Sequence, residues 1–198
     1  MKFYGRRREL ALLSSAYTAP GSAFIPIYGR RRIGKSELIV HFMAAKPGIY
    51  YVGKQAPGMA QLREFLEVAA RTLGEPLLAG ATVDSWKGAL ELVFNRWPRG
   101  RKLVLALDEF QWMAEASPEL PSVLQELWDR SWQQAGKGSY WRTTVHAALM
   151  AAFTWSRSIT PAPSCMTAFR GSTRSSRIPA GIGMFRVSAN SMRLPSMR

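Results

Sequence analysis

The sequence predicts an α/β fold in which helices cover a parallel sheet. Over the first 130 residues short apolar runs alternate with longer amphipathic segments, the pattern of parallel strands joined by crossover helices. The run at 102–107, KLVLAL, is almost wholly apolar, which is typical of a strand buried on both faces. With 198 residues, 47% of them hydrophobic, the chain can build a core, so it is not a wholly disordered protein.

Three strands are expected, at 23–28, 49–52 and 102–107. Pro26 lies inside the first of them and lacks the N–H that a central strand would donate, so this strand either bulges or has other boundaries.

Helices are expected where apolar residues recur every three or four positions. These segments are 36–45, 59–73, 85–97 and 118–132. We expect Asp84 to cap the third helix and Pro118 to stand in the first turn of the fourth.

Charge divides the chain into two parts. Residues 1–129 hold 17 Lys and Arg and all 13 Asp and Glu, whereas residues 130–198 hold 10 Lys and Arg and no acidic residue. A stretch of that length would ordinarily carry about eight acids. Residues 139–198 are also rich in Ser and Thr, with no alternating strand and no amphipathic helix longer than 143–153. We therefore expect an ordered domain at 1–138 and an irregular or disordered basic tail at 139–198.

Composition excludes several classes of protein. The single cysteine, Cys165, excludes a disulfide framework and a multi-cysteine zinc site. No run of 18 apolar residues occurs, so we expect no membrane-spanning helix. The arginine-rich stretch at 1–10 is not followed by an apolar run, so it is not a secretory signal, and we expect a cytoplasmic protein.

The segment GRRRIGKS matches the phosphate-binding pattern G-x-x-x-x-G-K-[ST] at every fixed position. Its glycines let the backbone curl so that successive N–H groups point at phosphate oxygens, and the following helix adds its positive end. In this pattern Lys35 reaches the β- and γ-phosphates and the Ser36 hydroxyl binds Mg²⁺. The residues expected at the nucleotide are Gly29, Arg30, Arg31, Arg32, Ile33, Gly34, Lys35 and Ser36. The three arginine side chains are expected to be mostly solvated, although they could also form a nucleic-acid patch.

Two acids follow the apolar strand at 103–107, and this is the Walker B pattern. A buried strand would deliver Asp108 to the carboxyl edge of the sheet, beside the phosphate loop, where it can hold Mg²⁺. Glu109 would then polarise a water molecule for attack on the γ-phosphate. We therefore expect Lys35 and Glu109 to be the catalytic residues, and Ser36 and Asp108 to be the metal ligands.

Four segments together resemble the archaeal-type P-loop ATPases, which are related to the AAA+ and signal-transduction ATPases. These segments are FYGRRREL at 3–10, YGRRRIGKS at 28–36, YVGKQ at 51–55 and LALDEFQWM at 105–113. The resemblance covers residues 1–138 and implies a three-layer P-loop NTPase sandwich that binds ATP and Mg²⁺. It also implies that Phe3, Gly5 and Arg6 lie near the adenine. Members of this family continue with a strand that bears a polar sensor residue, and no such strand is recognisable after residue 139. We therefore expect an incomplete sheet and slow hydrolysis.

Three hypotheses about function follow. The first is a truncated ATPase domain that hydrolyses ATP, with a nucleic-acid or protein partner. The second is a nucleic-acid-binding protein in which the basic tail binds and ATP regulates. The third is an inactive fragment of a disrupted ATPase gene, because a frame shift between about residues 137 and 146 permits codons for the C-G-S…M-E of the family's sensor strand and following helix.

Overall fold

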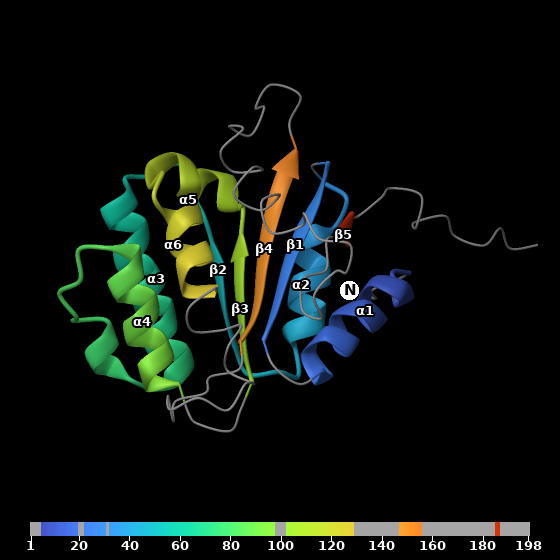
Figure 1. Ribbon diagram of the computed structural model, residues 1–198, viewed down its shortest axis with the longest axis horizontal. Coiled ribbons are helices and arrows are strands. Elements are labelled where there is room, and N and C mark those ends of the chain that lie inside the picture. The colour runs from blue at the N-terminus through green and yellow to red at the C-terminus, as the bar shows by residue number, and fades with distance from the viewer. Residues whose placement is uncertain are drawn as a thin grey trace, which may run out of the picture.

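The computed structural model describes residues 5–19, 22–30, 32–97, 102–128, 147–155 and 185–186, with Arg30 and the last two stretches described by their backbone alone. One parallel sheet lies between two layers of helices (Figure 1). Its strands are β1 (Ala23–Arg30), β2 (Gly48–Val52), β3 (Leu103–Asp108), β4 (Ala147–Trp155) and β5 (Phe185–Arg186). They are arranged in the order β2-β3-β4-β1-β5. The predicted α/β class with a parallel sheet is confirmed.

The helices divide between the two faces of the sheet (Figure 1). They are α1 (Arg7–Thr18), α2 (Lys35–Met43), α3 (Gly58–Leu73), α4 (Trp86–Arg96), α5 (Phe110–Ala116) and α6 (Leu120–Leu127), with a 3₁₀ turn at Pro76–Leu78. Helices α1 and α2 cover one face, and α3 to α6 cover the other.

Strand β3 contributes to the core on both sides, as the unbroken apolar run predicts. All six of its residues are buried. Leu103, Leu105 and Leu107 pack under α3 to α6. Val104 and Ala106 pack under α1 and α2, because successive side chains of a strand point to opposite faces.

The structure corrects the expectation that no further strand follows residue 139. Strand β4 lies between β3 and β1, pairing Ala148 with Val104 on one side and with Ala23 on the other. Its sequence, AALMAAFTW, is almost wholly apolar and shows no alternation of apolar and polar residues. Because most of these residues favour helices, the pattern is closer to that of a helix than to that of a strand. The short β5 is a second strand beyond residue 139. The remainder of the expected basic tail lies outside the described residues.

Pro26 stands within β1 opposite Ala151, in regular register. On the other side of β1, the two residues of β5 pair with Ile27 and Tyr28 alone. Most of that edge of β1 therefore has no partner strand among the described residues, and a proline is tolerated at such an edge.

Two predicted helix starts are wrong by one turn or less. Ser85, and not Asp84, is the N-cap of α4, because its hydroxyl accepts the N–H of Gly88 at 3.3 Å. Pro118 precedes α6, whose first-turn proline is Pro121. Helices α1 and α5 were not expected from the sequence.

Candidate functional site

The predicted phosphate loop connects β1 to the first turn of α2. Gly34 has φ 77° and forms the N-cap of α2, a left-handed conformation that side chains disfavour. Because Gly34 has no side chain, it cannot accept a hydrogen bond from the N–H groups of the first helical turn. The Lys35 side chain is buried, and its Nζ donates to the Gly29 carbonyl at 3.2 Å. The side chain of Lys35 therefore folds back over the loop toward Gly29.

The side chains expected around this loop lie in different surroundings. Ile33 is buried, whereas Arg32 is exposed and has φ 60°. Arg31 and the side chain of Arg30 lie outside the described residues.

Arg6 supports the phosphate loop from α1. Its Nη2 donates to the Ile33 carbonyl, and its Nη1 lies 3.7 Å from a carboxylate oxygen of Glu9. Burial lowers the pKa of Arg6, while the charges of Glu9 and Glu37 act in the opposite direction. The guanidinium therefore links the start of α1 to the backbone of the loop.

The adenine contacts implied by the family resemblance stay a prediction. Gly5, with φ 82°, precedes Arg6, and Phe3 lies outside the described residues.

The acidic pair follows β3 at the carboxyl edge of the sheet. Asp108 is buried, and its Oδ1 accepts the backbone N–H of Glu109 at 2.9 Å. Glu109 is half-buried in a left-handed conformation, φ 49°, at the N-cap of α5. Gln111 donates from its side-chain amide to the Glu109 carboxylate. Each carboxylate thus has at least one hydrogen-bond donor that fixes its orientation.

Tyr50, on β2, contacts the acidic residue that ends β3. Its hydroxyl donates to Oδ2 of Asp108 at 2.7 Å. Burial raises the pKa of Tyr50, and the hydrogen bond and charge of Asp108 raise it further, so the phenol stays protonated. Tyr50 could not be singled out from the sequence, because no motif contains it and its contact with Asp108 depends on the register of β2.

The loop after β2 passes directly beside the acidic pair. The N–H of Gly53 donates to the Asp108 carbonyl at 2.8 Å. A side chain at this position would place its Cβ 2.7 Å from the Glu109 carbonyl oxygen and 2.7 Å from Cγ of Met113. Glycine is therefore required by this close approach of two backbones.

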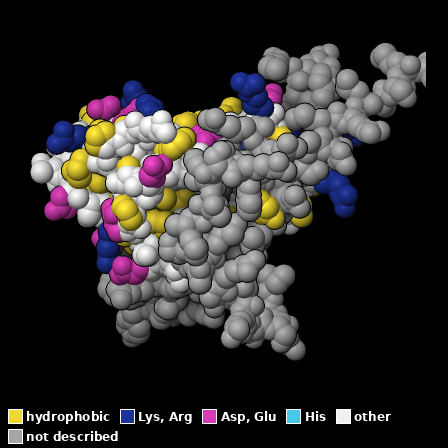
Figure 2. Space-filling model, turned by 90° about the horizontal axis from the view of Figure 1, so that it is seen from above, with side chains coloured by type: hydrophobic (Ala, Val, Ile, Leu, Met, Phe, Trp, Pro, Cys, Tyr) yellow, Lys and Arg dark blue, Asp and Glu magenta, His cyan; other side chains and the backbone are white. Residues whose placement is uncertain are grey.

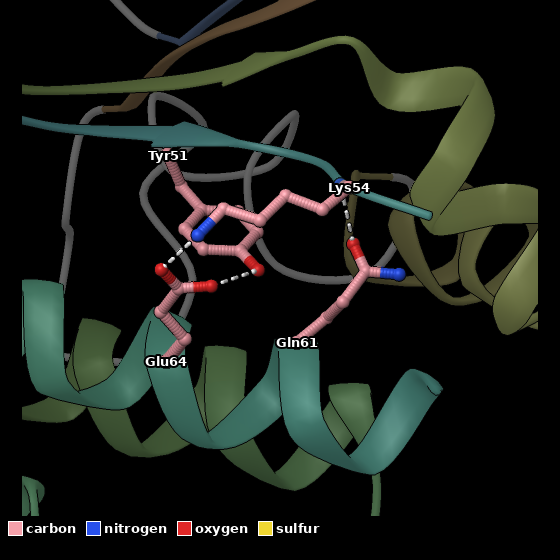
Figure 3. A network of polar contacts seen from close by, with 4 residues as sticks. All are labelled: Tyr51, Lys54, Gln61 and Glu64. Carbon is pink, nitrogen blue, oxygen red and sulfur yellow. Dashed lines mark hydrogen bonds and ion pairs between the residues drawn. The ribbon is translucent and has the colours of Figure 1, made fainter. Parts of the chain in front are cut away.

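Helix α3 holds the same loop through a polar network (Figure 3). The Tyr51 hydroxyl donates to Glu64 at 3.4 Å, and Lys54 forms an ion pair with the same carboxylate. The buried amide of Gln61 accepts the N–H of Lys54 at 3.0 Å and donates to the Ala56 carbonyl at 3.0 Å. The loop beside Asp108 is thus anchored on its far side.

The side-chain oxygens of Ser36 and Asp108, at this edge of the sheet, suit a Mg²⁺ ion that is bound together with a phosphate ligand. No group of three His, Cys, Asp or Glu that could form a complete metal cage occurs among the described residues. The hydroxyl of Ser36 and the carboxylate of Asp108 share the Tyr50 hydroxyl as a neighbour. Mg²⁺ ordinarily takes one or two such protein oxygens and completes its shell with water and substrate phosphates.

Solved structures share this arrangement of sheet and helices. The Walker-type ATPase PABY2304 of Pyrococcus abyssi superposes with a TM-score of 0.59 at 14% identity, over 93% of this chain and 54% of that one. The fold is that of the archaeal Walker-type ATPases. ADP-bound ORC2 of Aeropyrum pernix gives a TM-score of 0.59 at 17% identity, over 94% of this chain and 49% of that one. Cdc6p of Pyrobaculum aerophilum gives 0.55 at 17% identity, over 92% and 45%. The chain therefore spans about half the length of these Walker-type ATPase structures.

Sequence comparison gives a partial match and no family. No family model matches the chain. An uncharacterised protein of Methanocaldococcus jannaschii is 28% identical over 127 residues, which are 64% of this chain and 26% of that protein. No helix in the described part of this Walker-type ATPase fold combines the length and apolarity needed to cross a bilayer.

Proposed function

We propose that this chain binds Mg-ATP at the carboxyl edge of its sheet and hydrolyses the γ-phosphate. The observation that carries the proposal is the position of the Tyr50 hydroxyl, which donates to Asp108 at 2.7 Å and has the side chain of Ser36 as a neighbour. Ser36 belongs to the phosphate loop and Asp108 to the acidic strand. A single side chain, that of Tyr50, therefore lies near both halves of the proposed nucleotide site, although β1 and β3 are not neighbours in the sheet.

The phosphate loop supplies the binding energy in this proposal. Backbone N–H groups between Gly29 and Lys35, together with the N-terminus of α2, face the phosphate oxygens. The ammonium group of Lys35 leaves the Gly29 carbonyl, its partner at 3.2 Å, and pairs with the β- and γ-phosphates instead. The exchange replaces a neutral acceptor with an anionic one, which makes a stronger hydrogen bond.

The acidic strand and the loop hydroxyl supply the chemistry. When bound, Mg²⁺ neutralises charge that develops on the β- and γ-phosphate oxygens. Ser36 and Asp108 hold the ion and its water shell, and Glu109 accepts a proton from the attacking water. The water oxygen forms a bond to the γ-phosphorus as the bond from that phosphorus to the bridging oxygen breaks, so that ADP leaves with the electron pair.

Three variants test this proposal. Lys35→Ala should abolish binding of a fluorescent ATP analogue, because it removes the charge that faces the phosphates. Glu109→Gln should bind the analogue within a few-fold of the wild type and release no phosphate. Lys87→Ala is the matched control, since Lys87 lies on α4 and pairs with Glu126 at 2.8 Å. Unchanged affinity in Lys35→Ala would refute the assignment of the site.

The charge of residues 130–198, which contain ten basic and no acidic residues, favours nucleic-acid binding as a second candidate function. On the face seen in Figure 2, the described residues show acidic and basic side chains interspersed, with no patch of one sign. Affinity of the full chain for double-stranded DNA should then fall steeply between 50 and 200 mM salt, by roughly 10³-fold or more if about six phosphates are contacted. Absence of binding at the lower salt concentration would exclude this function.

A further inference from the structure

Tyr50, on β2, contacts the acidic residue that ends β3. Its hydroxyl lies 2.7 Å from Oδ2 of Asp108. The phenol ring packs against the α1–α2 side of the sheet, next to the buried cluster that includes Val104 and Ala106. Packing on that side holds the hydroxyl at the carboxylate.

The direction of the hydrogen bond between Tyr50 and Asp108 follows from the chemistry of the two groups. A carboxylate only accepts, so the Tyr50 hydroxyl donates its proton to Asp108. A phenol has one proton, so this hydrogen bond uses the whole donor capacity of Tyr50.

The hydrogen bond fixes a carboxylate that is a predicted metal ligand. Outer hydrogen bonds of this kind orient a ligand and raise its basicity, and their loss ordinarily weakens metal binding or activity by about 10- to 100-fold. The same phenol occupies one oxygen of Asp108, while the Glu109 N–H occupies the other. The carboxylate is therefore fixed before any ion arrives.

We propose that Tyr50 is a positioning residue for Mg²⁺ bound with nucleotide, because its hydroxyl fixes the Asp108 carboxylate. This inference rests on the proposed nucleotide site and adds a residue that no phosphate-loop or acidic-strand motif contains. Tyr50 touches neither the phosphates nor the reacting water, so its effect is confined to the metal-dependent part of binding.

The test separates nucleotide binding from metal binding. A fluorescent ADP analogue is titrated into Tyr50→Phe in EDTA, and the complex is then titrated with Mg²⁺. Affinity in EDTA should stay within about twofold of the wild type, whereas half-saturation by Mg²⁺ should rise about 10- to 100-fold. The matched control is Tyr51→Phe, which also removes a tyrosine hydroxyl, but one that bonds Glu64 on the opposite face of the sheet. The control should show neither change.

Two results would overturn the inference. Mg²⁺ half-saturation of Tyr50→Phe within twofold of the wild type would show that the hydroxyl does not position the ion. An equal loss of affinity in EDTA would show that Tyr50 supports the fold of the site and not the metal. In either case Lys35→Ala would still report on the nucleotide site itself. If instead the wild type binds no nucleotide, the proposed function fails together with this inference.

A measurement that keeps Tyr50 intact covers the case in which Tyr50→Phe does not fold. Addition of Mg²⁺ to the ADP complex of the wild type, and of Tyr51→Phe, should perturb the near-ultraviolet absorption of tyrosine, because the phenol of Tyr50 donates to Asp108, a proposed ligand of the ion. A spectrum unchanged by Mg²⁺ in both proteins would contradict the proposal.

Discussion

A single hydrogen bond behind the acidic pair should contribute measurably to stability. The indole N–H of Trp86, at the start of α4, donates to the Ser117 hydroxyl at 3.0 Å, and both residues are buried. Ser117 directly follows α5, the helix that begins after Glu109. The indole ring also packs on Phe65, with 5.4 Å between ring centroids. This contact therefore ties the helix that continues from Glu109 to the core of the α3–α6 layer.

Ser117→Ala removes the acceptor and leaves the buried indole N–H without this partner. Because one oxygen atom is lost and no large cavity forms, the cost is that of an unsatisfied buried donor, roughly 1–3 kcal/mol. With a urea m-value of about 2 kcal/mol/M, the unfolding midpoint should fall by about 0.5–1.5 M. Urea titration followed by tryptophan fluorescence measures this shift directly.

Two further variants make the result specific. Ser122→Ala replaces an exposed serine of α6 and should change stability by no more than about 0.5 kcal/mol. In a Trp86→Phe background the donor is already gone, so Ser117→Ala should cost much less than it does alone. If Ser117→Ala had the same midpoint as Ser122→Ala, or the same cost with and without Trp86, the reasoning would be refuted.

Three other predictions concern the site and its surroundings. Gly53→Ala should lower the free energy of unfolding by about 1–3 kcal/mol, because the new Cβ would lie 2.7 Å from the Glu109 carbonyl oxygen. Gly80→Ala is the control: a Cβ there would have no atom within 4 Å, so the variant should be nearly neutral in the same urea titration. Arg6→Met should weaken binding of the fluorescent ADP analogue about tenfold, because it removes the hydrogen bond that the guanidinium donates to the Ile33 carbonyl, and tenfold is the size of effect expected for one hydrogen bond to a charged group. Equal affinity of Arg6→Met and the wild type would show that the loop does not need this hydrogen bond. Burial and the charge of Glu64 raise the pKa of Tyr51. The contribution of the neutral Tyr51 phenol to folding stability is therefore full below the pKa of tyrosine in the unfolded chain, about 10, and declines as the pH rises above that pKa. Tyr51→Phe should flatten that alkaline decline in thermal melts, and an unchanged pH profile would contradict this.

The elements predicted well from the sequence are those whose local pattern agrees with their final surroundings. Strand β3 is apolar throughout and is buried on both faces. Helix α3 follows its predicted range within one residue, because its apolar residues form one continuous stripe that packs on the sheet. The motif at 29–36 fixes backbone shape as well as chemistry, and Gly34 has the positive φ that this shape requires. That the loop binds phosphate stays a prediction.

Elements that depend on distant partners were missed. Leu13 is the one fully buried residue of α1, so its apolar stripe is too weak to identify from spacing. Helix α5 has seven residues and begins after the left-handed Glu109. Strand β4 consists largely of residues that favour helices, and pairing with β1 and β3 decides its conformation. Tyr50 was missed for the same reason, since its hydroxyl meets Asp108 and Ser36 only after β2 has joined the sheet.

The order of the strands has a consequence for how the protein is made. Strands β1 and β3 carry the two halves of the proposed site, and both pair with β4, which lies between them. A ribosome synthesises β1, β2 and β3 before residue 147, so the central position of the sheet is empty until β4 emerges. During that interval the edges of β1 and β3 that later pair with β4 present unpaired N–H and C=O groups, which other chains can bind. Closure of the sheet, and with it assembly of the site, must therefore wait for β4.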